Sequence, residues 1–114
     1  MTVESGNYFG IDTDGGAAIF NYAKLVINDG EFYGAVGAIN NKAAEAQTTI
    51  NGGKFGGAYK ENLSTNYVIQ NNEGTLVVNY AEVVSGFGAI GAYGGTTTIK
   101  DGSFVADYSG VYTV

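Results

Sequence analysis

A short pattern recurs five times along the chain, and it constrains the fold more than any other feature. Its most regular members are five β-branched apolar residues, here called the anchors, spaced 24, 23, 28 and 21 residues apart: Val3, Ile27, Ile50, Val78 and Ile99. A second β-branched residue precedes each anchor, and such pairs favour β-strand. A period of 20 to 50 residues indicates a repeat architecture, in which each unit buries its apolar side against its neighbours.

Two further positions recur at fixed distances after the anchors. Five residues after each anchor stands a large apolar residue, in the order Tyr8, Phe32, Phe55, Val83 and Phe104. Three residues after the anchor, four of the five repeats carry a glycine, namely Gly6, Gly30, Gly53 and Gly102. Corners between strands often require a positive φ, which glycine adopts at little cost. We therefore expect a corner at each glycine, and a widened or missing corner in the fourth repeat, where Ala81 takes its place.

A unit of about 24 residues, with short strands turned at glycine, is typical of one rung of a parallel β-helix. We therefore predict an all-β fold, a β-solenoid that forms one domain over residues 1–114. It would have about five rungs, which start near residues 2, 26, 49, 77 and 98. Two repeats are longer than the others, which predicts loop insertions near 12–15 and 61–65. Rungs of a solenoid stack ~4.8 Å apart, so each recurring position becomes a ladder of like residues.

The position directly after the anchor should face solvent, because successive side chains of a strand alternate between its two faces. Three consecutive rungs carry asparagine there, at Asn28, Asn51 and Asn79. Stacked asparagines can bond amide to amide along the stack, as they do in cross-β assemblies. We interpret these three residues as a structural ladder and not as a ligand site.

Three segments show the repeat most clearly: VINDGEF at 26–32, TINGGKF at 49–55 and TIKDGSF at 98–104. They resemble the T-I-N-G-G-x-F repeats of right-handed parallel β-helix proteins, which are common in large surface proteins of gut bacteria and archaea and in bacteriophage fibre-like proteins. The resemblance covers nearly the whole chain and implies a right-handed coil. It specifies the fold more closely than the function, because the same solenoid serves adhesins, virion spikes and polysaccharide-cleaving enzymes.

Composition excludes several kinds of chemistry. The chain has no histidine, no cysteine and no arginine, and its five lysines against eleven acidic residues give a net charge of −6. Imidazole acid–base catalysis, thiolate chemistry and zinc sites of the usual kind are therefore excluded. This net negative charge disfavours nucleic acids and anionic membranes as partners. No apolar run approaches the ~18 residues of a membrane span, so we expect no cofactor, no nucleic-acid partner and no membrane insertion.

The carboxylates do not form a predicted active site or metal site. Asp29 and Asp101 share a repeat position but would lie three rungs apart, roughly 14 Å, beyond the ~5–9.5 Å that glycoside hydrolysis requires. Asp12 and Asp14 precede Gly15 in a turn that would suit calcium, but the further spaced carboxylates of known calcium loops are missing. The fold that the resemblance implies is shared with polysaccharide lyases that use an arginine as base and with hydrolases that have a histidine near their catalytic aspartates. This chain has neither arginine nor histidine. We predict no catalytic residue, no metal ligand and no enzymatic activity.

Aromatic residues are the candidates for contacts with partners. Tyr33 and Tyr80 are expected to point outward, and Tyr67 lies beside an insertion, so these three could contact a glycan or a protein interface. Phe87 and Tyr108 both lie nine residues after their anchors, and we expect them in the core.

The function expected from these features is that of a non-catalytic building block of an extracellular or virion surface assembly. A start at Met1 without a signal-peptide pattern favours a phage head fibre, tail fibre or decoration protein. The alternative is a module of a bacterial cell-surface adhesin that binds glycans, and a polysaccharide lyase or hydrolase is less favoured than either. Strand-like sequence reaches both ends without a polar capping segment, so we expect the solenoid ends to be covered in a homo-oligomer or by docking on a larger assembly.

Overall fold

The computed structural model describes residues 1–10, 17–34, 37–56 and 67–113. All regular secondary structure in these ranges is β-strand, and no helix occurs in them. The insertions predicted near 12–15 and 61–65, with Asp12, Asp14 and Gly15, lie outside the described residues.

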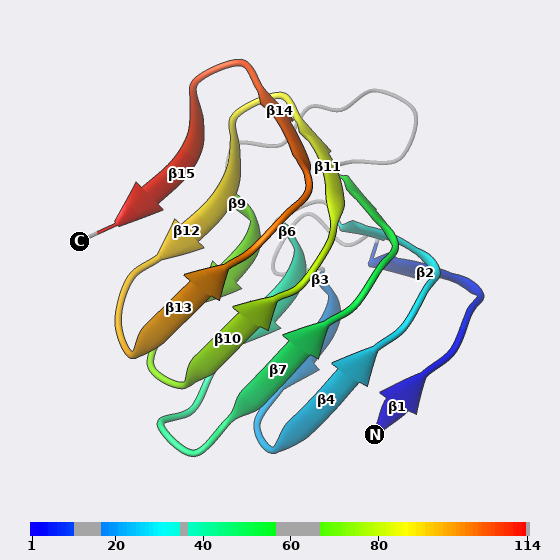
Figure 1. The fold of residues 1–114 in the computed structure, drawn as a ribbon, viewed down its shortest axis with the longest axis vertical. Coiled ribbons are helices and arrows are strands. Elements are labelled where there is room, and N and C mark those ends of the chain that lie inside the picture. The colour runs from blue at the N-terminus through cyan, green and yellow to red at the C-terminus, as the bar shows by residue number, and fades with distance from the viewer. Residues whose placement is uncertain (11–16, 35–36, 57–66, 114) are drawn as a thin grey trace.

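The strands form three parallel sheets of five strands each (Figure 1). Sheet A contains β1 (Thr2–Val3), β4 (Lys24–Ile27), β7 (Gln47–Ile50), β10 (Thr75–Val78) and β13 (Thr96–Ile99). Sheet B contains β2 (Asn7–Gly10), β5 (Glu31–Gly34), β8 (Lys54–Gly56), β11 (Glu82–Ser85) and β14 (Ser103–Ala106). Sheet C contains β3 (Ala17–Asn21), β6 (Gly37–Asn41), β9 (Tyr67–Asn71), β12 (Gly88–Ala92) and β15 (Ser109–Thr113).

The chain passes through sheets A, B and C in that order and then begins the next rung. Every strand pairs in parallel with the equivalent strand one rung away, for example β4 with both β1 and β7. The coil is right-handed (Figure 1). Five stacked strands in each sheet correspond to about four turns of roughly 23 residues. The all-β, right-handed parallel β-helix predicted from the repeat is confirmed.

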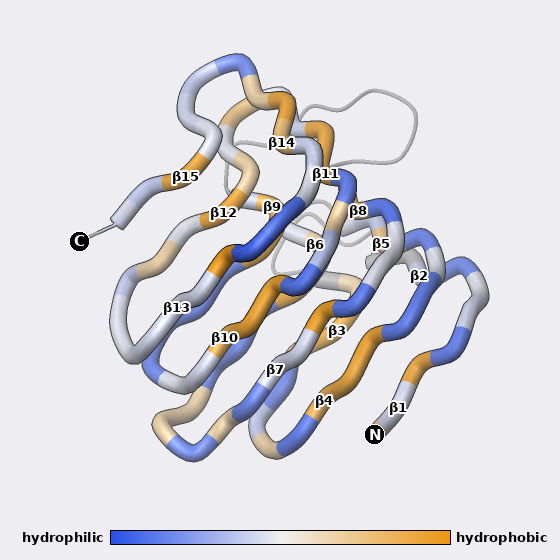
Figure 2. The backbone as a smooth tube through the Cα atoms, viewed as in Figure 1, coloured by the Kyte–Doolittle hydropathy of each residue, from blue (hydrophilic) through white to orange (hydrophobic). Residues whose placement is uncertain are grey.

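The anchors lie in register in sheet A. Val3 pairs with Ile27, Ile27 with Ile50, and Val78 with both Ile50 and Ile99. Their side chains point into the core, and those of the three middle rungs are fully buried. Figure 2 shows the result as a hydrophobic band that crosses β4, β7, β10 and β13, with a hydrophilic segment after each strand.

The second ladder of the core runs through sheet B at the position five residues after the anchor. Phe32 pairs with Tyr8 on one side and with Phe55 on the other. The rings stack nearly parallel, with centroids 5.0 Å apart in both pairs. Val83 continues the ladder above Phe55, and Phe104 ends it on the last rung. Offset stacks of this kind stabilise a core beyond the area that they bury.

Glycines form the corner between sheets A and B in four of the five rungs. Gly6, Gly30, Gly53 and Gly102 all have a positive φ, between 117° and 146°. A side chain at Gly30 would also lie only 2.9 Å from the ring of Phe32. Both backbone conformation and space therefore require glycine here.

The corner of the fourth rung is neither widened nor missing, so the expectation for Ala81 is wrong. Three residues separate β10 from β11, as they separate β7 from β8. The N–H of Glu82 donates to the carbonyl of Gly53 (3.0 Å), and the N–H of Ser103 donates to the carbonyl of Ala81 (3.0 Å). Hydrogen bonds from the rungs on both sides hold this corner in line although the glycine is replaced.

Candidate functional site

The asparagines on the outside of the solenoid form the ladder expected from the sequence. Nδ2 of Asn51 donates to Oδ1 of Asn28 (2.8 Å), and Nδ2 of Asn79 donates to Oδ1 of Asn51 (2.7 Å). The ladder extends to the first rung, where Nδ2 of Asn28 donates to Oε1 of Glu4 (3.1 Å). Each amide is thus engaged with the rung beside it. These residues join rungs along the outside of the solenoid.

A second asparagine ladder runs through the interior and was not anticipated. Asn21, Asn41 and Asn71 end β3, β6 and β9, where the chain turns from sheet C to sheet A, and all three are buried. Nδ2 of Asn21 donates to Oδ1 of Asn41 (3.1 Å), and Nδ2 of Asn41 donates to Oδ1 of Asn71 (2.9 Å). The sequence does contain a signal for it, because each of the three asparagines follows two residues after an isoleucine of sheet C.

Turn backbone and neighbouring threonines satisfy the remaining groups of the internal ladder. The Thr48 hydroxyl donates to Oδ1 of Asn41 (2.8 Å), and Nδ2 of Asn71 donates to the carbonyls of Gly74 and Thr96. Among the described residues, no buried side-chain nitrogen or oxygen lacks a hydrogen-bond partner. This fully paired polar ladder links the first three rungs and offers no free group to a ligand.

Asp29 and Asp101 each form a hydrogen bond within the corner to which they belong. Oδ1 of Asp29 accepts the N–H of Gly30 (2.8 Å), and Oδ1 of Asp101 accepts the N–H of Gly102 (2.8 Å). Both carboxylates are on the exposed side of the corner and three rungs apart. Within the described ranges, no group of three acidic residues is placed to hold a metal ion.

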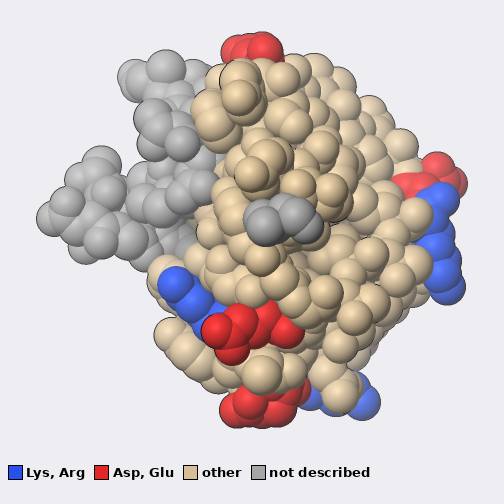
Figure 3. Space-filling model, turned by 90° about the vertical axis from the view of Figure 1, so that its left-hand side faces the viewer, with Lys and Arg blue, Asp and Glu red and all other residues tan. Residues whose placement is uncertain are grey.

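Aromatic rings gather around sheet C toward the last rung. Tyr67 stacks on Tyr112 (5.6 Å between centroids) and contacts Tyr93 edge-on (5.9 Å). Burial raises the pKa of Tyr93, and the neighbouring Tyr67 and Tyr112 raise it further. Figure 3 views the molecule from the end that carries the last rung and shows a surface that is mostly uncharged, with a few separate acidic and basic groups.

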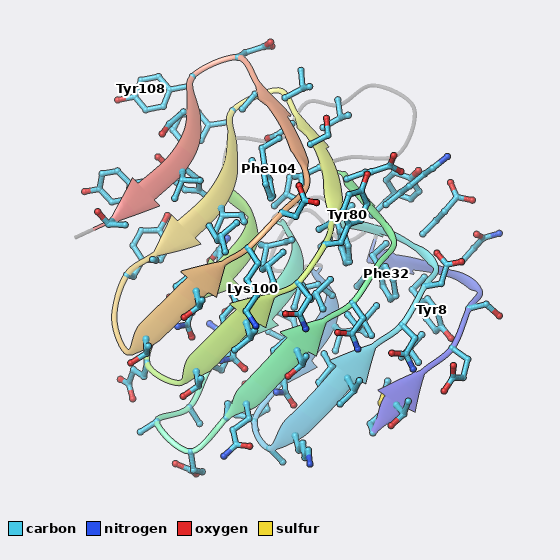
Figure 4. All side chains as sticks on the ribbon, in the orientation of Figure 1. Tyr8, Phe32, Tyr80, Lys100, Phe104 and Tyr108 are labelled. Atoms are coloured by element: carbon cyan, nitrogen blue, oxygen red, sulfur yellow. The ribbon has the colours of Figure 1, made fainter. Side chains whose placement is uncertain are left out.

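Two expectations for individual aromatics are corrected. Tyr67 is only 5% exposed, because its ring packs over Gly88 and Gly91, so it does not face solvent as a glycan contact would. Tyr108 is 72% exposed and not in the core. Its ring stacks on Phe87 with centroids 4.7 Å apart. Tyr108 belongs to the last rung and points outward from it (Figure 4), and no described ring covers its other side.

Tyr33 and Tyr80 do not form one site. Tyr33 lies half-buried in β5, and its hydroxyl donates to Oε1 of Glu31 (3.0 Å). Tyr80 is exposed in the corner that precedes β11, two rungs further along the solenoid (Figure 4).

No protein family model, no curated protein and no solved structure matches this chain significantly. No described segment forms a helix that could cross a membrane. The function must therefore be argued from the chain's own geometry.

Proposed function

We propose that this chain is a non-catalytic structural module of a virion or extracellular surface assembly, and we favour a bacteriophage head fibre, tail fibre or decoration protein. The observation that carries the proposal is the use of the polar side chains. Asn28, Asn51 and Asn79 bond from rung to rung, and Asp29 and Asp101 bond to their own corners. These groups hold the solenoid together and do not converge on a substrate.

The repeat supports the same proposal. Segments 26–32, 49–55 and 98–104 resemble the T-I-N-G-G-x-F repeats of β-helix proteins from phage fibres and microbial surfaces. A solenoid of in-register ladders also suits a spacer or building block, because its length grows by one rung at a time without a change of core.

The location of the protein tests this proposal. Antibodies raised against the purified chain should label particles of a phage that encodes it, or the outer surface of the cells that encode it, in immunogold electron microscopy. Pre-immune serum is the control. Labelling confined to the cell interior, with particles and envelopes unlabelled, would contradict the proposed role.

A separate assay addresses catalysis. The purified chain is expected to release neither reducing ends nor unsaturated products from a panel of neutral and acidic polysaccharides. Product formation that Asp29→Asn abolishes and Asp107→Asn leaves unchanged would show an active carboxylate and overturn the non-catalytic assignment.

A glycan-binding adhesin module is the second candidate, and the exposed ring of Tyr108 favours it. Together with Tyr112 it presents aromatic surface at the last rung, on the end of the solenoid that Figure 3 shows as mostly uncharged, and aromatic rings are common at recognition surfaces. Tyr80 and Tyr33 offer weaker sites of the same kind. Binding on a glycan array that is lost in Tyr108→Ala and kept in Tyr22→Ala, another exposed tyrosine, would favour this candidate.

A further inference from the structure

Exposed apolar side chains concentrate at the two ends of the solenoid. Nine large hydrophobic side chains are exposed among the described residues. Three belong to the first rung (Met1, Phe20, Tyr22) and four to the last (Val105, Tyr108, Val111, Tyr112). Only Tyr80 and Val84 lie elsewhere, on the fourth rung. Large apolar groups gathered in this way mark surfaces that contact other molecules.

The same rungs carry the outer edges of all three sheets. Sheets A, B and C end at β1, β2 and β3 on one side and at β13, β14 and β15 on the other, and no described strand pairs with these edges. Core positions on the last rung are less covered than their equivalents one rung below. Val78, Val83 and Ile90 are fully buried, whereas Ile99 and Phe104 are half-buried and Val111 is exposed. Such an edge is a template for another parallel strand.

The two ends carry opposite charges at the same repeat position. The exterior asparagine ladder begins at Glu4 and ends at Lys100, and both terminal side chains are exposed. If a second copy continued the solenoid, its Glu4 would stand one rung from Lys100 of the first. Oppositely charged side chains at adjacent ladder positions attract, and like charges would repel.

The aromatic positions match across the same junction. Phe20 and Tyr112 occupy one recurring position on the outside of sheet C and are 41% and 43% exposed, respectively. In sheet B, Tyr8 and Phe104 occupy the position of the stacked rings, and both are half-buried (Figure 4). Continuation by one rung would stack ring on ring at both positions, as Tyr8 and Phe32 already stack within the chain.

We propose that the partner is a second copy of this chain, which stacks head to tail with its first rung on the last rung of its neighbour. β13, β14 and β15 of one copy then pair in parallel with β1, β2 and β3 of the next, and Lys100 meets Glu4. This inference rests on the proposed structural role, since it names the partner of that module. Repetition of the contact produces a filament or, if the copies rotate enough to close, a ring.

Cysteine cross-linking tests the polarity of the stack, because the chain has no cysteine of its own. Glu4→Cys and Lys100→Cys are made separately and given different affinity tags. Adjacent ladder positions are close enough for a disulfide, whose Cα atoms lie ~4.4–6.8 Å apart. Under mild oxidation we expect dimers in the mixture of the two variants and mainly monomers in each variant alone. Dimers from Lys100→Cys alone would indicate head-to-head contact and overturn the inference.

Charge reversal tests the contact itself by sedimentation velocity over a range of concentrations. Glu4→Lys and Lys100→Glu should each weaken self-association about tenfold, and the double variant should recover most of the loss. Glu45→Lys, an exposed site away from both ends, is the control and should not change association. Urea melts of each variant separate loss of association from loss of folding. A wild-type chain that stays monomeric throughout, or a double variant that does not recover, would overturn the inference.

The two proposals can fail separately. A monomeric chain found on particles or cell surfaces would contradict head-to-tail stacking and leave the proposed role intact. A head-to-tail oligomer confined to the cell interior would contradict the proposed surface role and leave head-to-tail stacking intact.

Discussion

Replacement of Asn41 by leucine removes the centre of the internal asparagine ladder while keeping the number and branching of the heavy atoms of the side chain. Asn41 is completely buried. Its Oδ1 accepts hydrogen bonds from Asn21 Nδ2 (3.1 Å) and the Thr48 hydroxyl (2.8 Å), and its Nδ2 donates to Asn71 Oδ1 (2.9 Å) and the Thr75 carbonyl (3.2 Å). The variant therefore breaks these four hydrogen bonds, and a longer fifth one from Nδ2 to the Ala46 carbonyl (3.5 Å), at a fully buried site.

The expected loss follows from the partners left behind. Nδ2 of Asn21 keeps other acceptors, among them the carbonyls of Ala23 and Gln47. The Thr48 hydroxyl loses its acceptor, and Oδ1 of Asn71 loses its donor. A buried polar group without a partner costs about 1–3 kcal/mol, so two such groups predict a loss of about 2–6 kcal/mol in the free energy of unfolding. That is a large part of the ~5–15 kcal/mol that stabilises a typical domain.

The external ladder supplies the matched control. Asn51→Leu also breaks two amide hydrogen bonds, to Asn28 and from Asn79, but the site is exposed and water can replace them. We expect a loss below about 1 kcal/mol. Urea melts followed by circular dichroism measure both variants. Losses within about 0.5 kcal/mol of each other would refute the argument that burial, and not the hydrogen bonds alone, makes the internal ladder important.

Three further predictions concern the core, a corner and the aromatic cluster. Phe55→Ala should lower the free energy of unfolding by about 3–5 kcal/mol, because Phe55 is buried and stacked in its ladder. In the same urea melts the exposed Phe20→Ala should cost much less, and equal losses would show that the stacked ladder is not the core. Gly30→Ala should cost about 1–3 kcal/mol, since φ is +136° and the added Cβ would meet a ring. Gly110→Ala, with open space around it, should change stability by less than about 0.5 kcal/mol. The pKa of Tyr93 is raised in the folded state. The stability that its protonated form contributes is therefore fully present below pH 10, the ordinary tyrosine pKa, and is lost as the pH rises through the pKa of the folded state. Tyr93→Phe should therefore reduce the loss of stability at alkaline pH, and an unchanged pH profile would contradict the assignment.

The periodicity of the sequence was sufficient to predict the coil and most of its contacts. In a parallel in-register solenoid, residues one period apart become neighbours, so a recurring position converts directly into a ladder. This is why the register of the anchors, the stacking of Phe32 on Phe55 and the amide bonds of Asn51 follow from the sequence alone. The corners could likewise be predicted from the recurring glycine, because few other residues adopt the positive φ that these corners have.

The tertiary structure decided how deeply each side chain is buried and where the pattern departs from its period. Asn41 and Asn51 look alike in sequence, yet only Asn41 faces the interior, because it ends a strand of sheet C where the chain turns inward. Tyr67 is covered because two glycines on the next rung leave room for its ring, and Tyr108 is exposed because no described rung lies above it. Burial depends on what stands on both sides of a residue, across rungs and across turns, and the order of residues along one rung does not contain that information.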